Sequence, residues 1–117
     1  MLYDKKWDDK FAELQAQRAA LHQAADLIEK HGHAKYALRN SEGRLCLLGA
    51  INMAVTGDPL HELPASCKLY CKVDEVVKKN RPDFPFHRFN HAVDWNNAPE
   101  RKPEEVIALL REAADAV

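Results

Sequence analysis

The sequence predicts a mostly α-helical fold of about five helices around a central buried helix, with one short β-hairpin. Three observations support this fold class. Apolar residues recur at helical spacing in four segments, one further segment is almost wholly apolar, and glycine or proline stands between the segments. With 117 residues, the chain has the size of one domain that buries a core without disulfides. We therefore expect a single helical domain over residues 1–117.

A long amphipathic helix is expected from Trp7 to about Gly32. Its apolar stripe advances by four and three residues from Trp7 through Phe11 and Leu14, and Arg18 interrupts it. Gly32 can adopt the left-handed conformation that ends many helices. We expect this helix to lie along its own domain. The stripe leaves a coiled coil with a partner open, and with it a homo-oligomer.

A turn is expected at Asn40-Ser-Glu-Gly43, because glycine allows positive φ there. The short apolar segments on either side, residues 36–39 and 44–45, then predict a β-hairpin. Such a hairpin is too small to be stable alone and must lie on the helices.

The central helix is expected from about Cys46 to Val55. Asn52 is the single strongly polar residue of this segment, which indicates a helix buried on nearly all sides. Gly49 would let another backbone approach closely. A glycine-then-proline stop signal, Gly57-Asp-Pro59, ends the helix.

Three further helices are expected toward the C-terminus. The first runs over about residues 64–80 with valines on one face, and the second runs over 84–95 after Asp83 as its N-cap. The last begins with Pro103 in the first helical position and Glu104-Glu105 in its first turn.

Charge and hydropathy exclude several function classes. Seventeen Lys and Arg against 18 Asp and Glu give a net charge of −1, so no global field attracts nucleic acid or an anionic membrane. No apolar run reaches the roughly 18 residues of a membrane span, and the N-terminus has no apolar leader segment. Three cysteines, an odd number, are better explained as thiols or metal ligands than as disulfides. We expect a cytoplasmic protein that does not bind membranes.

Two motifs carry a resemblance to a known family. They are Cys46-Leu-Leu-Gly-Ala-Ile51 after Glu42-Gly-Arg-Leu45, and Trp95-Asn-Asn-Ala-Pro-Glu-Arg101 before Glu104-Glu-Val-Ile-Ala-Leu-Leu110. With them the chain resembles, over roughly residues 21–55 and 90–116, a family of small bacterial and phage proteins known only as a domain of unknown function.

The second motif departs from the family pattern. That pattern usually continues after the tryptophan as Asn-Asp-Ala-Pro-Gly-Arg-Thr, whereas this chain has Asn97, Glu100 and Lys102 in place of the aspartate, glycine and threonine. A role that needs the aspartate's carboxylate is therefore not expected here. The resemblance implies the fold and transfers no catalytic residues.

A zinc site is one candidate. Cys67-x3-Cys71-x15-His87-x3-His91 has two ligand pairs, each on one helical face, separated much as in Cys2His2 zinc sites. Two consecutive antiparallel helices could bring the four ligands onto one structural zinc ion. The simpler alternative, which we favour, is that the cysteines are half-buried small hydrophobes and no cofactor is bound. An iron site of His87, His91 and Asp94 ranks lower, because one helix gives poor facial geometry.

A thiol-dependent hydrolase or transferase is another candidate. Cys46 stands at a helix N-terminus, where the helix dipole favours a thiolate, and His91 and Asn96 follow in the order of some cysteine hydrolases. This chemistry requires all three side chains within hydrogen-bonding reach. The alternative, which we favour, is that Cys46 packs as an ordinary buried residue.

The segment Trp95, Asn96 and Asn97 is a candidate binding loop, although its side chains can equally fix the turn into the last helix. With no phosphate-binding loop and no paired carboxylates, the sequence favours a non-enzymatic helical protein that binds or modulates a protein partner. The thiol-dependent enzyme is the alternative. Whether the chain is an enzyme is left open.

Overall fold

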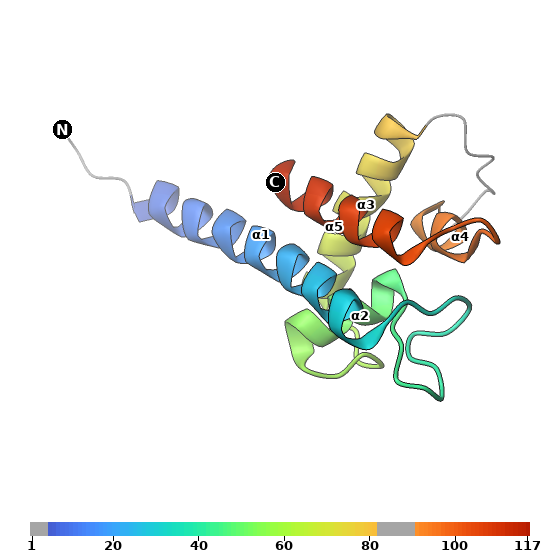
Figure 1. Ribbon diagram of the computed structural model, residues 1–117. Coiled ribbons are helices and arrows are strands. Elements are labelled where there is room, and N and C mark those ends of the chain that lie inside the picture. Colours follow the sequence, from blue (N-terminus) through green and yellow to red (C-terminus); the bar gives the residue numbers. More distant parts are fainter. Residues whose placement is uncertain (1–4, 82–90) are drawn as a thin grey trace.

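The computed structural model describes residues 5–81 and 91–117, and these form five α-helices (Figure 1). The helices are α1 (Lys5–His31), α2 (Leu47–Thr56), α3 (Pro64–Asn80), α4 (His91–Asn97) and α5 (Pro103–Asp115). The mostly helical fold is thus confirmed. α1 packs along α5 and α2, while α3 contacts α2, α4 and α5. Across the described segments, no helix is both long and apolar enough to cross a membrane.

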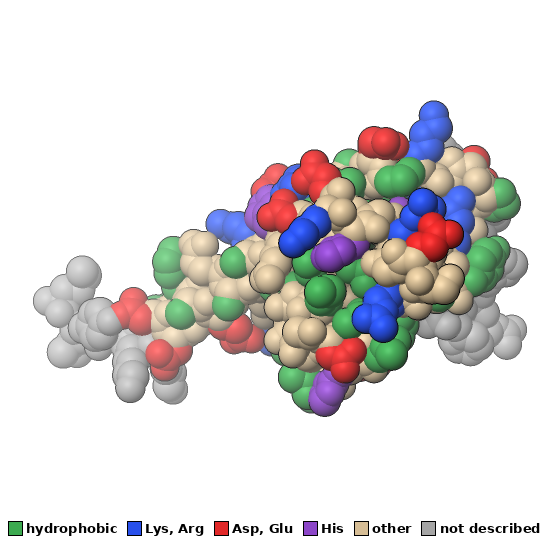
Figure 2. All heavy atoms as spheres, turned by 60° about the horizontal axis from the view of Figure 1, so that its bottom comes forward, with side chains coloured by type: hydrophobic (Ala, Val, Ile, Leu, Met, Phe, Trp, Pro, Cys, Tyr) green, Lys and Arg blue, Asp and Glu red, His purple; other side chains and the backbone are tan. Residues whose placement is uncertain are grey.

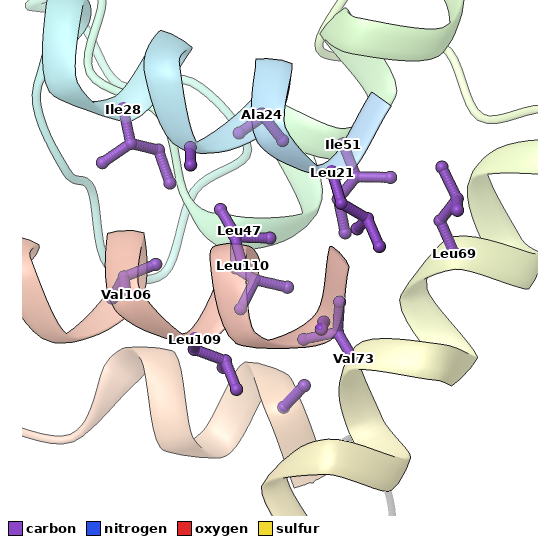
Figure 3. Packing of buried hydrophobic residues seen from close by; sticks show 14 of the residues in the cluster. Leu21, Ala24, Ile28, Leu47, Ile51, Leu69, Val73, Val106, Leu109 and Leu110 are labelled. Carbon is purple, nitrogen blue, oxygen red and sulfur yellow. The ribbon is translucent and has the colours of Figure 1, made fainter. Parts of the chain in front are cut away.

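One hydrophobic core joins the helices. Figure 3 shows Leu47 of α2 and Leu110 of α5 at its centre, with Leu21 of α1 on the side that α3 closes. The larger side chains that are almost fully buried come from α1, the segment before α2, and helices α2, α3 and α5: Leu21, Ile28, Leu45, Leu47, Ile51, Val73, Val77, Val106, Leu109 and Leu110. In α2 the buried residues are Leu47 and residues 49–52, and residues 53–56 are partly buried.

The helix ends follow from the residues that stand there. Gly32 has φ +95° and donates its N–H to the carbonyl of Ile28 at 2.8 Å, which ends α1 as predicted. Gly57, with φ +84°, ends α2 in the same way. α4 begins where Asp74 of α3 accepts a hydrogen bond from Ala92 N–H at 3.0 Å. The helix predicted over 84–95 falls partly outside the described residues.

The predicted β-hairpin is wrong. The turn at residues 40–43 forms, with Gly43 at φ +79°, but the described chain has only isolated bridges around Leu45 and no sheet. Tyr36 has φ +64°, a left-handed conformation that no extended strand contains. The bonds from Cys46 N–H to the carbonyl of Leu38 at 3.2 Å and from Asn40 N–H to the carbonyl of Arg44 at 3.0 Å form one isolated antiparallel bridge, Arg39–Leu45. Pairing stops after this one bridge, because Tyr36 leaves the extended conformation and bonds to Asn97 of α4.

The N-terminal half of α1 projects beyond the other helices (Figure 1). Every residue from 7 to 16 is exposed, and we call this segment the arm. Trp7 is 69% exposed, Phe11 63% and Leu14 37%. The apolar stripe of α1 is therefore buried only in its second half.

Candidate functional site

Asn96, near the end of α4, is a buried hydrogen-bonding centre. Its Oδ1 accepts hydrogen bonds from Leu47 N–H at 3.1 Å and from His33 Nε2 at 2.7 Å. Its Nδ2 donates to the carbonyl of Ala34 at 3.1 Å and to Oδ1 of Asn97 at 3.0 Å. A side-chain amide has two acceptor positions and two donor hydrogens, so all of them are used. Asn96 thereby joins α4 to the start of α2 and to the loop after α1.

The loop of residues 33–38 is held against α4 by these bonds and by one more. Tyr36 N–H donates to Oδ1 of Asn97 at 2.9 Å, which fixes the left-handed backbone of Tyr36. Because Oδ1 of Asn96 can only accept, the Nε2 atom of His33 must carry a proton. Burial lowers the pKa of His33, with Lys35 and Arg101 acting in the same direction, although the hydrogen bond to Asn96 opposes them.

Cys46 is the N-cap residue of α2 and is buried. Its Sγ accepts a hydrogen bond from Gly49 N–H at 3.3 Å, a capping role that serine or asparagine more often fills. Burial raises the pKa of the Cys46 thiol, and the backbone N–H groups at the start of the helix only partly oppose this. The thiol therefore stays protonated at neutral pH.

Gly49 allows the closest backbone approach in this region. A Cβ at this position would lie 2.0 Å from the carbonyl oxygen of Leu38, far inside van der Waals contact. The close backbone approach expected at Gly49 is thus confirmed. No side chain fits between the loop of residues 33–38 and α2, which explains why a glycine stands within this otherwise bulky apolar segment.

Trp95 covers the core beneath two guanidinium groups. The guanidinium carbon of Arg101 lies 3.8 Å from the centre of the indole ring, and that of Arg81 lies 5.1 Å from it. Arg101 also donates to the carbonyl of Trp95 at 2.8 Å and pairs with Glu105 at 2.9 Å. Trp95 thus fixes the turn into α5.

An open hollow of about 350 Å³ lies beside Asn97 on the outer side of this junction. Its walls are mainly apolar and come from three parts of the chain: Tyr36, Ala37, Leu38, Cys46, Leu48, Val93 and Asn97. Tyr36 is 81% exposed, so its ring gains little from packing in the fold. A preformed apolar hollow with one amide and one exposed aromatic ring can receive an apolar group from another molecule.

The structure brings together two of the three residues of the candidate catalytic set. Cys46 is the N-cap of α2, and the side chain of Asn96 in α4 accepts a hydrogen bond from the next residue, Leu47 N–H. Cys46 and the Asn96 side chain therefore meet at the N-terminus of α2. His91 begins α4, but its side chain lies outside the described residues. All four hydrogen-bonding positions of Asn96 are occupied by other groups. A catalytic role for Cys46, His91 and Asn96 stays a prediction.

Of the candidate zinc ligands, Cys67 and Cys71 are free thiols exposed on α3. His87 and the side chain of His91 lie outside the described residues. Within residues 5–81 and 91–117, no three His, Cys, Asp or Glu side chains are grouped so that they could hold a metal ion. The four-ligand zinc site cannot be built from the described side chains and stays a prediction, as does the iron site that shares its histidines.

The partners of Asn96 and Asn97 leave no signal in the sequence. His33 and Tyr36 bond to Asn96 and Asn97, more than 60 positions away in the chain. No local pattern marks such a contact. The only signal was the polar pair Asn96-Asn97 beside a core tryptophan, which indicated side chains bonded to backbone.

Comparison with known proteins gives one match. The model of a family of unknown function, DUF6197, matches residues 13–116. Neither the curated proteins nor the solved structures contain a match to this chain. The expected membership in a family without an assigned activity is therefore confirmed, and the chain belongs to the DUF6197 family of unknown function.

Proposed function

We propose that this protein is a small helical binding protein that receives an apolar side chain of a protein partner in the hollow beside Asn97. The observation that supports it is the combination of this hollow with the exposed ring of Tyr36 at its rim. We also propose that it acts in the cytoplasm, where its three free thiols stay reduced.

The volume and the lining of the hollow favour an apolar side chain over a polar ligand. Its volume of about 350 Å³ is at the lower end of small-molecule pockets, which suits one side chain better than a cofactor. Leu38, Leu48 and Val93 provide apolar walls, and the Asn97 amide stands among them. Exposed tyrosine rings are common anchors in protein interfaces, because they provide contact area at a small cost in side-chain entropy.

The backbone around the hollow is preorganised. Tyr36 holds a left-handed conformation that costs a non-glycine residue roughly 1–2 kcal/mol. The bond from Tyr36 N–H to Asn97 offsets this cost, and Asn96 holds the neighbouring carbonyl of Ala34. Strained residues in a rigid surround are often found at binding sites. A partner would therefore bind without ordering this loop.

The test uses amino-acid amides as probes of the hollow. Nuclear magnetic resonance spectra of the ¹⁵N-labelled protein are recorded while N-acetyl-leucine amide or N-acetyl-phenylalanine amide is added. We expect saturable shifts of the amide signals of Ala37, Leu38, Leu48 and Asn97, and none with N-acetyl-glycine amide, which lacks a side chain. Non-saturating or scattered shifts up to the solubility limit of the probes would contradict the proposal.

A filling variant is the matched control. Ala37→Trp places a ring in the hollow and should abolish the shifts, whereas Ala19→Trp, on the exposed surface of α1, should leave them unchanged. If Ala37→Trp does not fold, Leu48→Ala enlarges the hollow and should weaken leucine binding instead. Equal shifts in the native protein and in a folded Ala37→Trp variant would reject this site.

The second candidate function is a thiol-dependent hydrolase or transferase that uses Cys46. The observation in its favour is that Cys46 forms part of the hollow. Its raised pKa and its bond to Gly49 N–H weaken the candidate. Iodoacetamide labelling at neutral pH, followed by mass spectrometry, decides between the two. Labelling of Cys46 faster than of the exposed Cys67 and Cys71 would support the enzyme, and slower labelling would reject it.

A further inference from the structure

The arm of α1 presents an apolar face that continues the core stripe. Trp7, Phe11 and Leu14 follow the same spacing as the buried Leu21 and Ile28 of the same helix. Figure 2 shows hydrophobic side chains along the arm as it projects from the rest of the molecule. The same stripe is therefore buried at one end of the helix and exposed at the other.

Arg18 marks the boundary between the two halves. Its guanidinium donates to the carbonyls of Ala114 at 3.4 Å and Val117 at 3.1 Å, at the end of α5. α5 thus covers the stripe as far as Arg18, and residues 7–16 are all exposed. A second helix that lay on the arm would continue the packing that α5 provides farther along α1.

The charges of the arm select the kind of partner. The arm and the two lysines that precede it in α1, residues 5–16, together contain three cations, Lys5, Lys6 and Lys10, and three carboxylates, Asp8, Asp9 and Glu13. A segment with no net charge does not attract nucleic acid or an anionic membrane, and it favours no strongly charged peptide. It also does not repel a copy of itself. The rings of Trp7 and Phe11 form an apolar surface on a segment with no net charge, as is typical of faces that pair with another helix.

We infer that the arm binds the arm of a second copy of this chain, with the two helices antiparallel. In this arrangement the rings of Trp7 and Phe11 pack on the same stripe of the other copy. A parallel pairing would bring the other helices of both copies to the same end of the paired arms, where α5 already covers the stripe beyond Arg18. An antiparallel pairing places the other helices of the two copies at opposite ends of the paired arms. A twofold axis then relates the two apolar faces of the arms.

The surface area that two arms can bury limits the stability of this dimer. A buried aromatic side chain contributes about 150–250 Å². With Trp7 and Phe11 about two-thirds exposed, two crossed arms bury roughly 1,000 Å² or less in total. Stable interfaces bury about 1,200 Å² or more, so the dimer should be weak and should form only at raised protein concentration.

Sedimentation velocity over a concentration series tests the inference. We expect the weight-average sedimentation coefficient to rise with concentration in the native protein. Phe11→Glu should keep the protein monomeric over the whole series. Ala12→Glu introduces the same charge on the same exposed arm, about 100° around the helix from Phe11, and should behave like the native protein.

Tryptophan fluorescence gives a second readout. Trp95 is buried and should contribute a constant signal, so a blue shift of the emission with rising concentration reports burial of Trp7. The shift should disappear in Phe11→Glu. Because Phe11 is exposed, its replacement should leave the melting temperature at low concentration unchanged, which separates loss of pairing from unfolding.

Three results would overturn the inference. The first is a monomer at every concentration, and the second is a dimer that persists in Phe11→Glu. The third is a blue shift of the emission on vesicles of anionic phosphatidylglycerol with no self-association, which would assign the arm to a membrane surface. The probe experiment on the hollow is independent of all three, because the hollow contains no residue of the arm.

Discussion

The contact of Asn96 with the loop of residues 33–38 and the start of α2, which we call the Asn96 junction, differs from the arm of α1 in how far its side chains are satisfied within the fold. At the junction, each hydrogen-bonding position of Asn96 has a partner, and Gly49 leaves no room for a Cβ. On the arm, Trp7 and Phe11 are exposed and gain little from the fold. The junction contains residues of both sequence motifs, whereas the arm contains none.

This difference separates residues that hold the fold together from residues that are available to bind another molecule. A buried side chain with all its bonds made within the fold stabilises the fold and has nothing left for a ligand. A large apolar side chain in water stabilises nothing and is available for binding. By this criterion Asn96 and Trp95 hold the fold together, while a binding role for Trp95, Asn96 and Asn97 stays a prediction. Tyr36 and Phe11 are the candidates for contact with other molecules.

The largest expected effect is that of Gly49→Ala. Its Cβ would lie 2.0 Å from the carbonyl oxygen of Leu38, so the loop or α2 must move. We expect a loss of about 3 kcal/mol or more in the free energy of unfolding, measured by urea denaturation. Gly43→Ala is the control. Its Cβ would meet no other atom, so its cost is only that of the positive φ of Gly43, a strain that Gly49 does not have, and should be about 1 kcal/mol. Equal losses in both variants would show that the close approach is unimportant.

Asn96→Ala should have the next largest effect. It leaves Leu47 N–H and the carbonyl of Ala34 buried without their partner, which costs about 2–4 kcal/mol for the two groups. Asn97→Ala removes an acceptor for Tyr36 N–H in a more exposed place and should cost about 1 kcal/mol. Thermal unfolding of the two variants side by side measures the difference. A smaller loss in Asn96→Ala than in Asn97→Ala would contradict the role of Asn96.

Much of the helical fold could be predicted because its signals are local. Apolar spacing and stop residues place α1, α3 and α5 close to their observed bounds, and Pro103 begins α5 as expected. The hairpin prediction failed for a tertiary reason. The turn at Asn40 forms, but pairing is limited to one bridge, because Tyr36 bonds to Asn97 of α4 and does not continue a strand. Local sequence does not contain that information.

The candidate site was predictable only in part. The sequence indicated Asn96 and Asn97 as residues that bond to backbone, and both do so. It did not indicate His33 or Tyr36, because contacts between distant residues leave no periodic pattern. It also suggested a thiolate at Cys46 from the helix dipole, whereas burial raises the pKa of the thiol in the folded protein. Burial depends on the loop of residues 33–38, which no motif places over the cysteine.

The junction should also respond to pH through His33. Burial lowers its pKa below the ordinary value of 6.5, so the unfolded chain binds a proton more readily than the folded protein. The stabilising effect of neutral His33 is complete above about pH 7 and decreases as the pH falls below 6.5. His33→Gln keeps a donor for Asn96 without titrating, so its unfolding free energy should change less between pH 7 and pH 5.5. Parallel profiles for the two proteins would reject a titration at His33.

The smallest expected effect on stability is that of truncating the arm's aromatic side chains. Trp7→Ala combined with Phe11→Ala removes two large rings that are mostly exposed. At low protein concentration the free energy of unfolding should therefore change by about 0.5 kcal/mol or less. Leu21→Ala, farther along the same stripe but fully buried, should cost about 2–5 kcal/mol. The measurement must be made on dilute protein, because pairing of the arms would stabilise the folded state at high concentration. If the double variant loses as much stability as Leu21→Ala, the arm packs on its own chain in solution, and its apolar face is not available to a second copy.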